Sequence, residues 1–131
     1  MTSNLPKQIL QQQFDQLIAA QSHIEFVLAV TADGHLVASA SRSEHNFKRL
    51  AAMGSTLVSL GDTVSSELNM GNCRNLIAEN DGGIVVFMHI TKSLMLVAQT
   101  SNRNGLGMLL SAARSCVEKI VAELKAAITP Q

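Results

Sequence analysis

The chain has 131 residues, an ordinary size for one domain, and its 47% apolar and 15% charged residues are typical of a folded protein and exclude intrinsic disorder. Ten basic residues balance ten acidic ones, and Trp and Tyr are absent, so the basic stripe and stacking aromatics of nucleic-acid-binding proteins are missing. No apolar run could cross a bilayer or serve as a signal peptide, so we expect one cytoplasmic domain over residues 1–131.

The first half of the chain contains a helix, a hairpin and a second helix. Apolar residues at helical spacing predict a helix over 5–20, with Asn4 as its cap. Two β-prone runs, 25–31 and 35–40, flank the pair Asp33-Gly34, which is a strong hairpin signal. A long apolar periodicity then predicts a helix over 44–68, with Asn46 as a possible cap.

The second half contains three strands and a helix. Residues 73–79 come close to alternating, whereas 84–90 and 94–100 are continuous apolar runs bounded by turns and typical of the centre of a sheet. The last helix is expected over 106–128. The order α-β-β-α-β-β-β-α predicts an α+β fold with a largely antiparallel sheet. The strands that lie side by side across the middle helix are not determined by these patterns.

Cysteine and histidine residues give no pattern of a catalytic or metal site. Cys73 and Cys116 are far apart in sequence, and we expect reduced, buried thiols rather than a disulfide or a zinc site. His89 lies within an apolar run, which favours a sheet histidine bonded to the backbone. Cys73 and His89 could meet across strands, but no Asn or Asp is evidently placed to orient them. We therefore expect no enzyme activity, metal or cofactor.

Three local motifs, in this order and spacing, resemble the Roadblock family of dynein light-chain-like proteins, and especially its bacterial members. They are the segment 30–39 around Asp33-Gly34, the helix start 50–53, and the segment 77–83 that ends in Gly82-Gly83. The resemblance covers nearly the whole chain. It implies a five-stranded sheet with the middle helix on one face and the two terminal helices on the other. It also implies homodimerisation through the middle helix and the third strand, and regulation or scaffolding of small Ras-like GTPases.

The middle helix carries the strongest signal for self-association. Gly54 and Gly61 are seven residues apart and lie on nearly the same face, although a helical glycine costs about 1 kcal/mol relative to alanine. One interpretation is the close approach of a second chain, and the other is close packing on the chain's own sheet. Met53, Thr56, Leu60 and Thr63 extend the apolar surface of the helix sideways beyond one stripe, which favours the dimer.

The strand over 73–79 is polar along much of its length. At an edge of the sheet it would expose unpaired N–H and C=O groups, which a second copy could satisfy. The alternative is a simple edge guarded by Arg74 and Glu79. The residues expected in the dimer interface are Leu50, Met53, Gly54, Leu57, Val58, Gly61, Val64, Arg74, Leu76 and Ile77.

The expected function is a non-catalytic homodimer that binds a small GTPase or an equivalent signalling partner and modulates its nucleotide cycle. Lys48, Arg49 and Ser55 are the residues expected nearest to that partner. The alternative is a sensor of the profilin, longin or PAS-like kind that holds a small ligand against the sheet, although the central strands offer few polar groups to orient a ligand.

Overall fold

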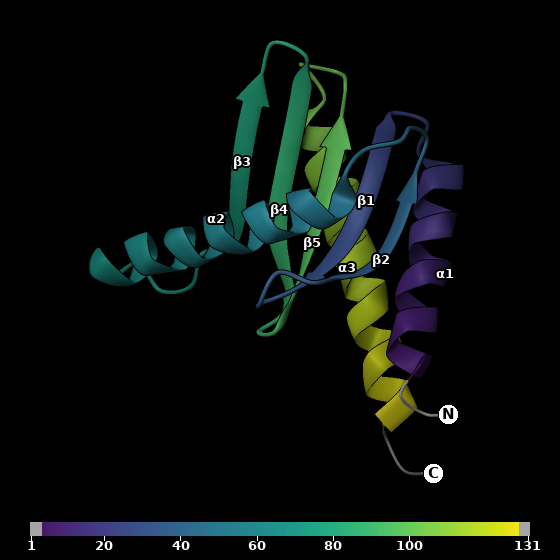
Figure 1. The fold of residues 1–131 in the computed structure, drawn as a ribbon, viewed down its shortest axis with the longest axis horizontal. Coiled ribbons are helices and arrows are strands. Elements are labelled where there is room, and N and C mark those ends of the chain that lie inside the picture. The colour runs from purple at the N-terminus through teal and green to yellow at the C-terminus, as the bar shows by residue number, and fades with distance from the viewer. Residues whose placement is uncertain (1–3, 129–131) are drawn as a thin grey trace.

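The eight elements follow the expected order (Figure 1). The computed structural model describes residues 4–128. The helices and strands are α1 (Leu5–Ala20), β1 (Ile24–Thr31), β2 (Leu36–Ser41), α2 (Phe47–Glu67), β3 (Asn75–Asn80), β4 (Gly83–Thr91), β5 (Leu94–Thr100) and α3 (Leu106–Ile128).

The ends of the helices follow from local chemistry, with two corrections. Asn4 precedes α1, but its side chain makes no capping hydrogen bond, so the first turn relies on Pro6. α2 begins at Phe47 rather than at residue 44, because the Asn46 side chain accepts a hydrogen bond from the Arg49 N–H at 3.1 Å. Beyond α2, Asn69 has a φ of 56°, a left-handed conformation that cannot continue the helix.

The five strands form one antiparallel sheet in the order β2-β1-β5-β4-β3. The sequence patterns did not determine which strands lie side by side across α2. The structure places β1 beside β5 at the centre of the sheet. This position explains why β1 and β5 are almost wholly buried. β3 lies at one edge, paired only with β4.

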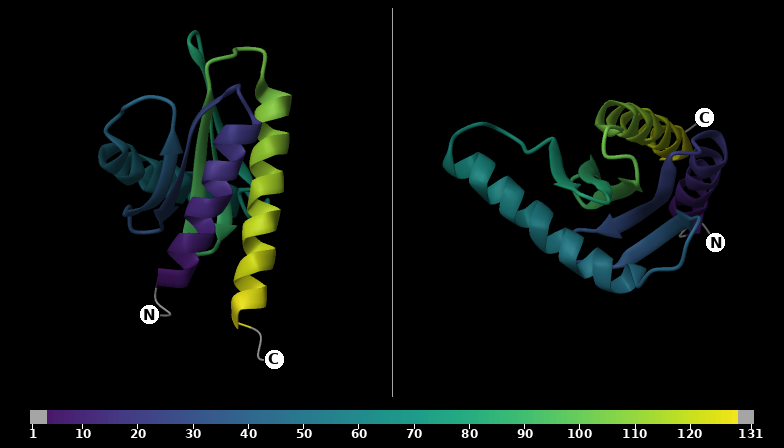
Figure 2. Two further views of the ribbon diagram at one scale, coloured as in Figure 1. Left: turned by 90° about the vertical axis from the view of Figure 1, so that its right-hand side faces the viewer. Right: turned by 90° about the horizontal axis from the view of Figure 1, so that it is seen from above.

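Helices cover both faces of the sheet, as expected (Figure 2). α1 and α3 pack side by side on one face, where Phe14, Leu109 and Ile120 are fully buried. α2 crosses the other face over a smaller cluster that includes Phe26, Phe87 and Val97. One helix therefore has to cover a face that spans five strands, and α2 leaves part of its own surface uncovered.

Candidate protein-binding surface

α2 has one face on the sheet and another in solvent. Its buried residues, Ala51, Gly54, Val58 and Ser65, recur at helical spacing and face the chain's own core. The large apolar residues on its other side are exposed by 42% or more. Together with Leu68, which caps the helix, we call these the apolar stripe of α2, and the stripe consists of Met53, Leu57, Leu60, Val64 and Leu68.

The two glycines of α2 pack against residues of their own chain. A Cβ added to Gly54 would lie 3.4 Å from the Phe87 ring, and one added to Gly61 would lie 3.2 Å from the Cys73 sulfur. Gly54 thus lets α2 approach the sheet closely. These distances favour the interpretation of close packing on the chain's own sheet, and the contact of these glycines with a second chain stays a prediction. Val58 is also buried against the sheet, and Leu50 is half-buried against the same cluster.

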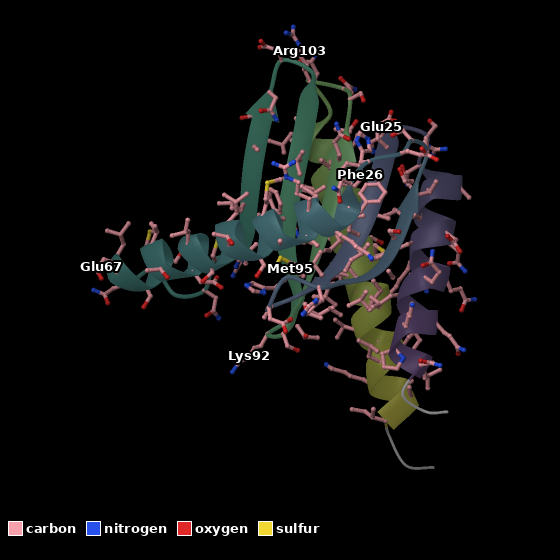
Figure 3. All side chains as sticks on the ribbon, in the orientation of Figure 1. Glu25, Phe26, Glu67, Lys92, Met95 and Arg103 are labelled. Carbon is pink, nitrogen blue, oxygen red and sulfur yellow. The ribbon has the colours of Figure 1, made fainter. Side chains whose placement is uncertain are left out.

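The C-terminal turns of α2 extend past the edge of the sheet (Figure 1). Glu67 lies near their free end, well beyond β3 (Figure 3). Leu68 is 59% exposed and Met70, in the loop that leads back to β3, is 63% exposed. Neither residue was among those expected at an interface. The spacing 53-57-60-64-68 was the available signal, since these positions follow one another on one side of a helix.

β3 borders the same region as an open edge. The strand order places β3 at an edge, the condition under which the sequence predicted pairing with a second copy. Leu76 is half-buried beneath α2, in contact distance of Gly61, whereas Ile77 is 38% exposed. Arg74 lies in the loop just before the strand and is exposed. Unpaired backbone along such an edge can accept a further strand.

The three residues expected nearest to a partner lie at the opposite end of α2. Lys48 and Arg49 are exposed in its first turn. Ser55 is half-buried, and its hydroxyl donates to the Ala32 carbonyl at 2.5 Å, which fastens α2 to the β1–β2 hairpin. Ser55 is therefore engaged within the chain, and Lys48 and Arg49 remain the exposed pair.

A cavity of about 1170 Å³ opens where the loop after α2 returns to the sheet. His89 on β4 and Asp62 on α2 both line it, and His89 Nε2 lies 3.2 Å from an Asp62 carboxylate oxygen. The expectation of a backbone-bonded His89 is therefore wrong. His89 Nδ1 is buried and has no hydrogen-bond partner within residues 4–128. Asp62 was not predictable as the partner of His89, because the two residues belong to different elements.

Cys73 lines the same cavity, but its thiol has another partner. It lies 3.7 Å from the Asn75 carbonyl oxygen, and no hydrogen bond joins it to His89 in the described part of the chain. Cys73 is half-buried rather than buried, which corrects the expectation, whereas Cys116 is buried as expected. Burial raises the pKa of Cys116 to about 11, against a smaller opposing effect of Lys119.

Two further features of residues 4–128 bear on function. No three His, Cys, Asp or Glu side chains among them come together in a way that could hold a metal ion. None of the described helices combines the length and the apolar character needed to traverse a bilayer.

Comparison with known proteins identifies a family and several solved structures that this chain resembles. The family model described as the Roadblock/LC7 domain matches residues 10–100. No curated protein matches the sequence. Among solved structures, MglB of Myxococcus xanthus aligns with a TM-score of 0.84 at 15% identity, covering 95% of this chain and 94% of that one. A structure titled "MglB with tetrameric arrangement" aligns with a TM-score of 0.82 at 10% identity, covering 95% and 93%.

Profilin II of Acanthamoeba castellanii is similar in fold at a greater distance. Its TM-score is 0.64 at 11% identity, and the alignment covers 86% of this chain and 97% of that one. The chain therefore has the α+β architecture that Roadblock domains and profilins share. Because the family model spans most of its length, the chain belongs to the Roadblock/LC7 family.

Proposed function

We propose that this chain is a homodimeric, non-catalytic regulator that acts in the cytoplasm on a small Ras-like GTPase or an equivalent signalling partner. The observation that carries the proposal is the apolar stripe of α2. Five large apolar side chains on one helix face, each exposed by 42% or more, form a contiguous surface of the kind that marks protein interfaces. Family membership supports the class of function.

The proposed dimer joins the apolar stripe and the β3 edge of one chain to their copies in a second chain. The stripe would supply the buried centre of the interface. Pairing of the two β3 strands would satisfy their outer backbone groups and join two sheets into one. The interface residues are then Met53, Leu57, Leu60, Val64 and Leu68 of α2 with Arg74, Leu76 and Ile77 beside and in β3, whereas Gly54, Val58 and Gly61 support the helix from within.

Light scattering tests the dimer. The wild-type chain is expected to have the mass of two chains, and the double variant Leu57→Asp with Val64→Asp the mass of one. Met108→Asp is the matched control, because Met108 is 58% exposed on α3, away from α2. It should remain dimeric. Ile77→Pro is expected to weaken the dimer by blocking strand pairing. A dimer that survives both changes to the proposed surface would refute this arrangement.

The effect on a GTPase is tested by GTP hydrolysis. Each small Ras-like GTPase of the source organism is assayed with and without the wild-type dimer, and one of them should change its hydrolysis or nucleotide-exchange rate. Lys48→Glu with Arg49→Glu should abolish the effect while the protein remains dimeric. If no GTPase responds to the dimer, the regulatory part of the proposal fails and the dimer can still stand.

A further inference from the structure

Within the part of the chain that the structure describes, the C-terminal end of β4 lacks a strand neighbour on one side. β3 pairs with β4 only as far as Met88, whereas β4 continues to Thr91. The remaining residues pair with β5 alone, through an irregular register between His89 and Thr91. An unpaired stretch of strand edge can accept an extended segment, whose backbone completes the ladder.

The cavity of about 1170 Å³ lies beside this stretch. Met88, His89 and Thr91 line it from β4, and the loop 69–75 and the α3 residues Arg114, Val117 and Glu118 enclose it. The apolar stripe of α2 contributes none of its lining residues. Arg74 is the one lining residue that also belongs to the proposed dimer interface, and the rest of the cavity is a second surface that the proposed homodimer leaves unexplained.

Positive charge dominates the cavity wall. Arg74, Lys92 and Arg114 line it, and none of these side chains makes an ion pair or a hydrogen bond within residues 4–128. Two acidic residues also line it. Asp62 faces His89 at 3.2 Å, and Glu118 is the other acidic residue of the cavity wall. Three cations against two carboxylates, with His89 counted as neutral, leave a net positive charge on the wall, which favours a ligand that carries negative charge.

Lys92 has a distinctive position. It lies in the β4–β5 turn, immediately after the unpaired stretch, and its side chain extends away from the sheet (Figure 3). Arg114 approaches the cavity from α3, on the other side of the same stretch. A segment paired with β4 would therefore have a cation near its end and another along one face.

We propose that this cavity binds an extended, acidic peptide segment of a partner protein, which adds a short strand beside His89–Thr91 and places carboxylates near Lys92 and Arg114. The backbone of β4 supplies the pairing and the cations supply the preference for acidic sequence. This interaction does not depend on the proposed GTPase regulation, and its binding groups on β4, Lys92 and Arg114 lie outside the proposed dimer interface.

NMR titration of the full-length protein tests the site. The probe is a blocked hexapeptide of alternating Glu and Val, and its matched control is the same peptide with Lys in place of Glu. The acidic peptide is expected to shift the amide resonances of His89, Thr91 and Arg114 in a saturable way, and to slow exchange of the His89 amide. The Lys peptide should do neither, and added salt should weaken the acidic peptide.

Charge reversal provides the second arm. Lys92→Glu and Arg114→Glu should each weaken binding about fivefold, the size of one exposed charge pair. Lys48→Glu, which reverses an exposed cation on α2, should leave it unchanged. The proposal is overturned if the acidic peptide causes no shifts, if its shifts map to the apolar stripe of α2 or the outer edge of β3 and not to the cavity, or if the Lys peptide binds equally well. Sodium acetate that reproduces the full set of shifts and the slowed exchange would also overturn strand addition.

Discussion

The His89 imidazole and the Asp62 carboxylate meet at 3.2 Å and join β4 to α2 near the point where the helix leaves the sheet. Beyond this contact α2 has few anchors within its own chain. Ser65 is buried, and the backbone N–H of Met70 donates to the Ser65 carbonyl at 2.9 Å. The contact therefore lies close to the part of α2 that projects past β3 (Figure 1).

Asp62→Asn is expected to lower the free energy of unfolding by about 1 kcal/mol or less, because both side chains are partly exposed and such pairs contribute little. Urea unfolding followed by circular dichroism measures the change. Glu44→Gln is the control, since Glu44 is exposed before α2 and its side chain forms no hydrogen bond or ion pair in the described residues. An equal loss in both variants would show that general charge, and not the pairing with His89, is responsible.

Substitutions of Gly54 test whether this side of α2 packs against the sheet. Its added Cβ would be in ordinary contact with the Phe87 ring at 3.4 Å, so Gly54→Ala should keep or raise stability by up to about 1 kcal/mol through helix propensity. Gly54→Leu should overfill the space above the sheet and lower stability by about 1–3 kcal/mol. Thermal unfolding compares the two. A Leu variant that is stable and merely monomeric would restore the interface role of this glycine.

The elements were predictable from sequence because periodicity and turn chemistry act locally. The bounds of α1, β5 and α3 agree with those expected, and Gly34, with a φ of 91°, occupies the hairpin turn. The side of α2 that faces the sheet was not predictable, because Gly54 and Met53 are adjacent in sequence and both fit an interface. The packing of the Phe87 side chain of β4 against α2 shows that Gly54 is buried on the sheet, whereas Met53 is exposed.

The two cysteines should differ in reactivity toward iodoacetamide near pH 8. Burial raises the pKa of Cys116 to about 11, so almost none of it is the reactive thiolate, whereas Cys73 is half-buried at the cavity. Mass spectrometry of the native protein should find label on Cys73 first. Cys73→Ser is the control and should remove most of the early label. Faster labelling of Cys116 would mean that α3 opens readily in solution.

Asp33 in the β1–β2 turn should report on its hydrogen bond with Thr31. The Thr31 hydroxyl donates to the carboxylate and lowers the pKa of Asp33 below its ordinary 3.8, with a smaller contribution from His35. The contribution of this group to stability is therefore complete above pH 3.8 and is lost as the pH falls through its folded pKa. In an NMR titration, Thr31→Val should raise the pKa of Asp33. Thr91→Val, in a different turn, should leave it unchanged.

Gly83 should be the least replaceable glycine of the chain. Its φ is 142°, and an added Cβ would overlap the Thr100 carbonyl oxygen and crowd the Ser101 Cα at 2.9 Å, so β4 and the end of β5 would have to separate. Gly83→Ala is expected to cost about 3 kcal/mol or more, a large share of the stability of a small domain. Gly82→Ala is the matched control, because nothing lies within 4 Å of its Cβ position. Chemical unfolding that gives both variants the same midpoint would contradict the close approach of these two strands.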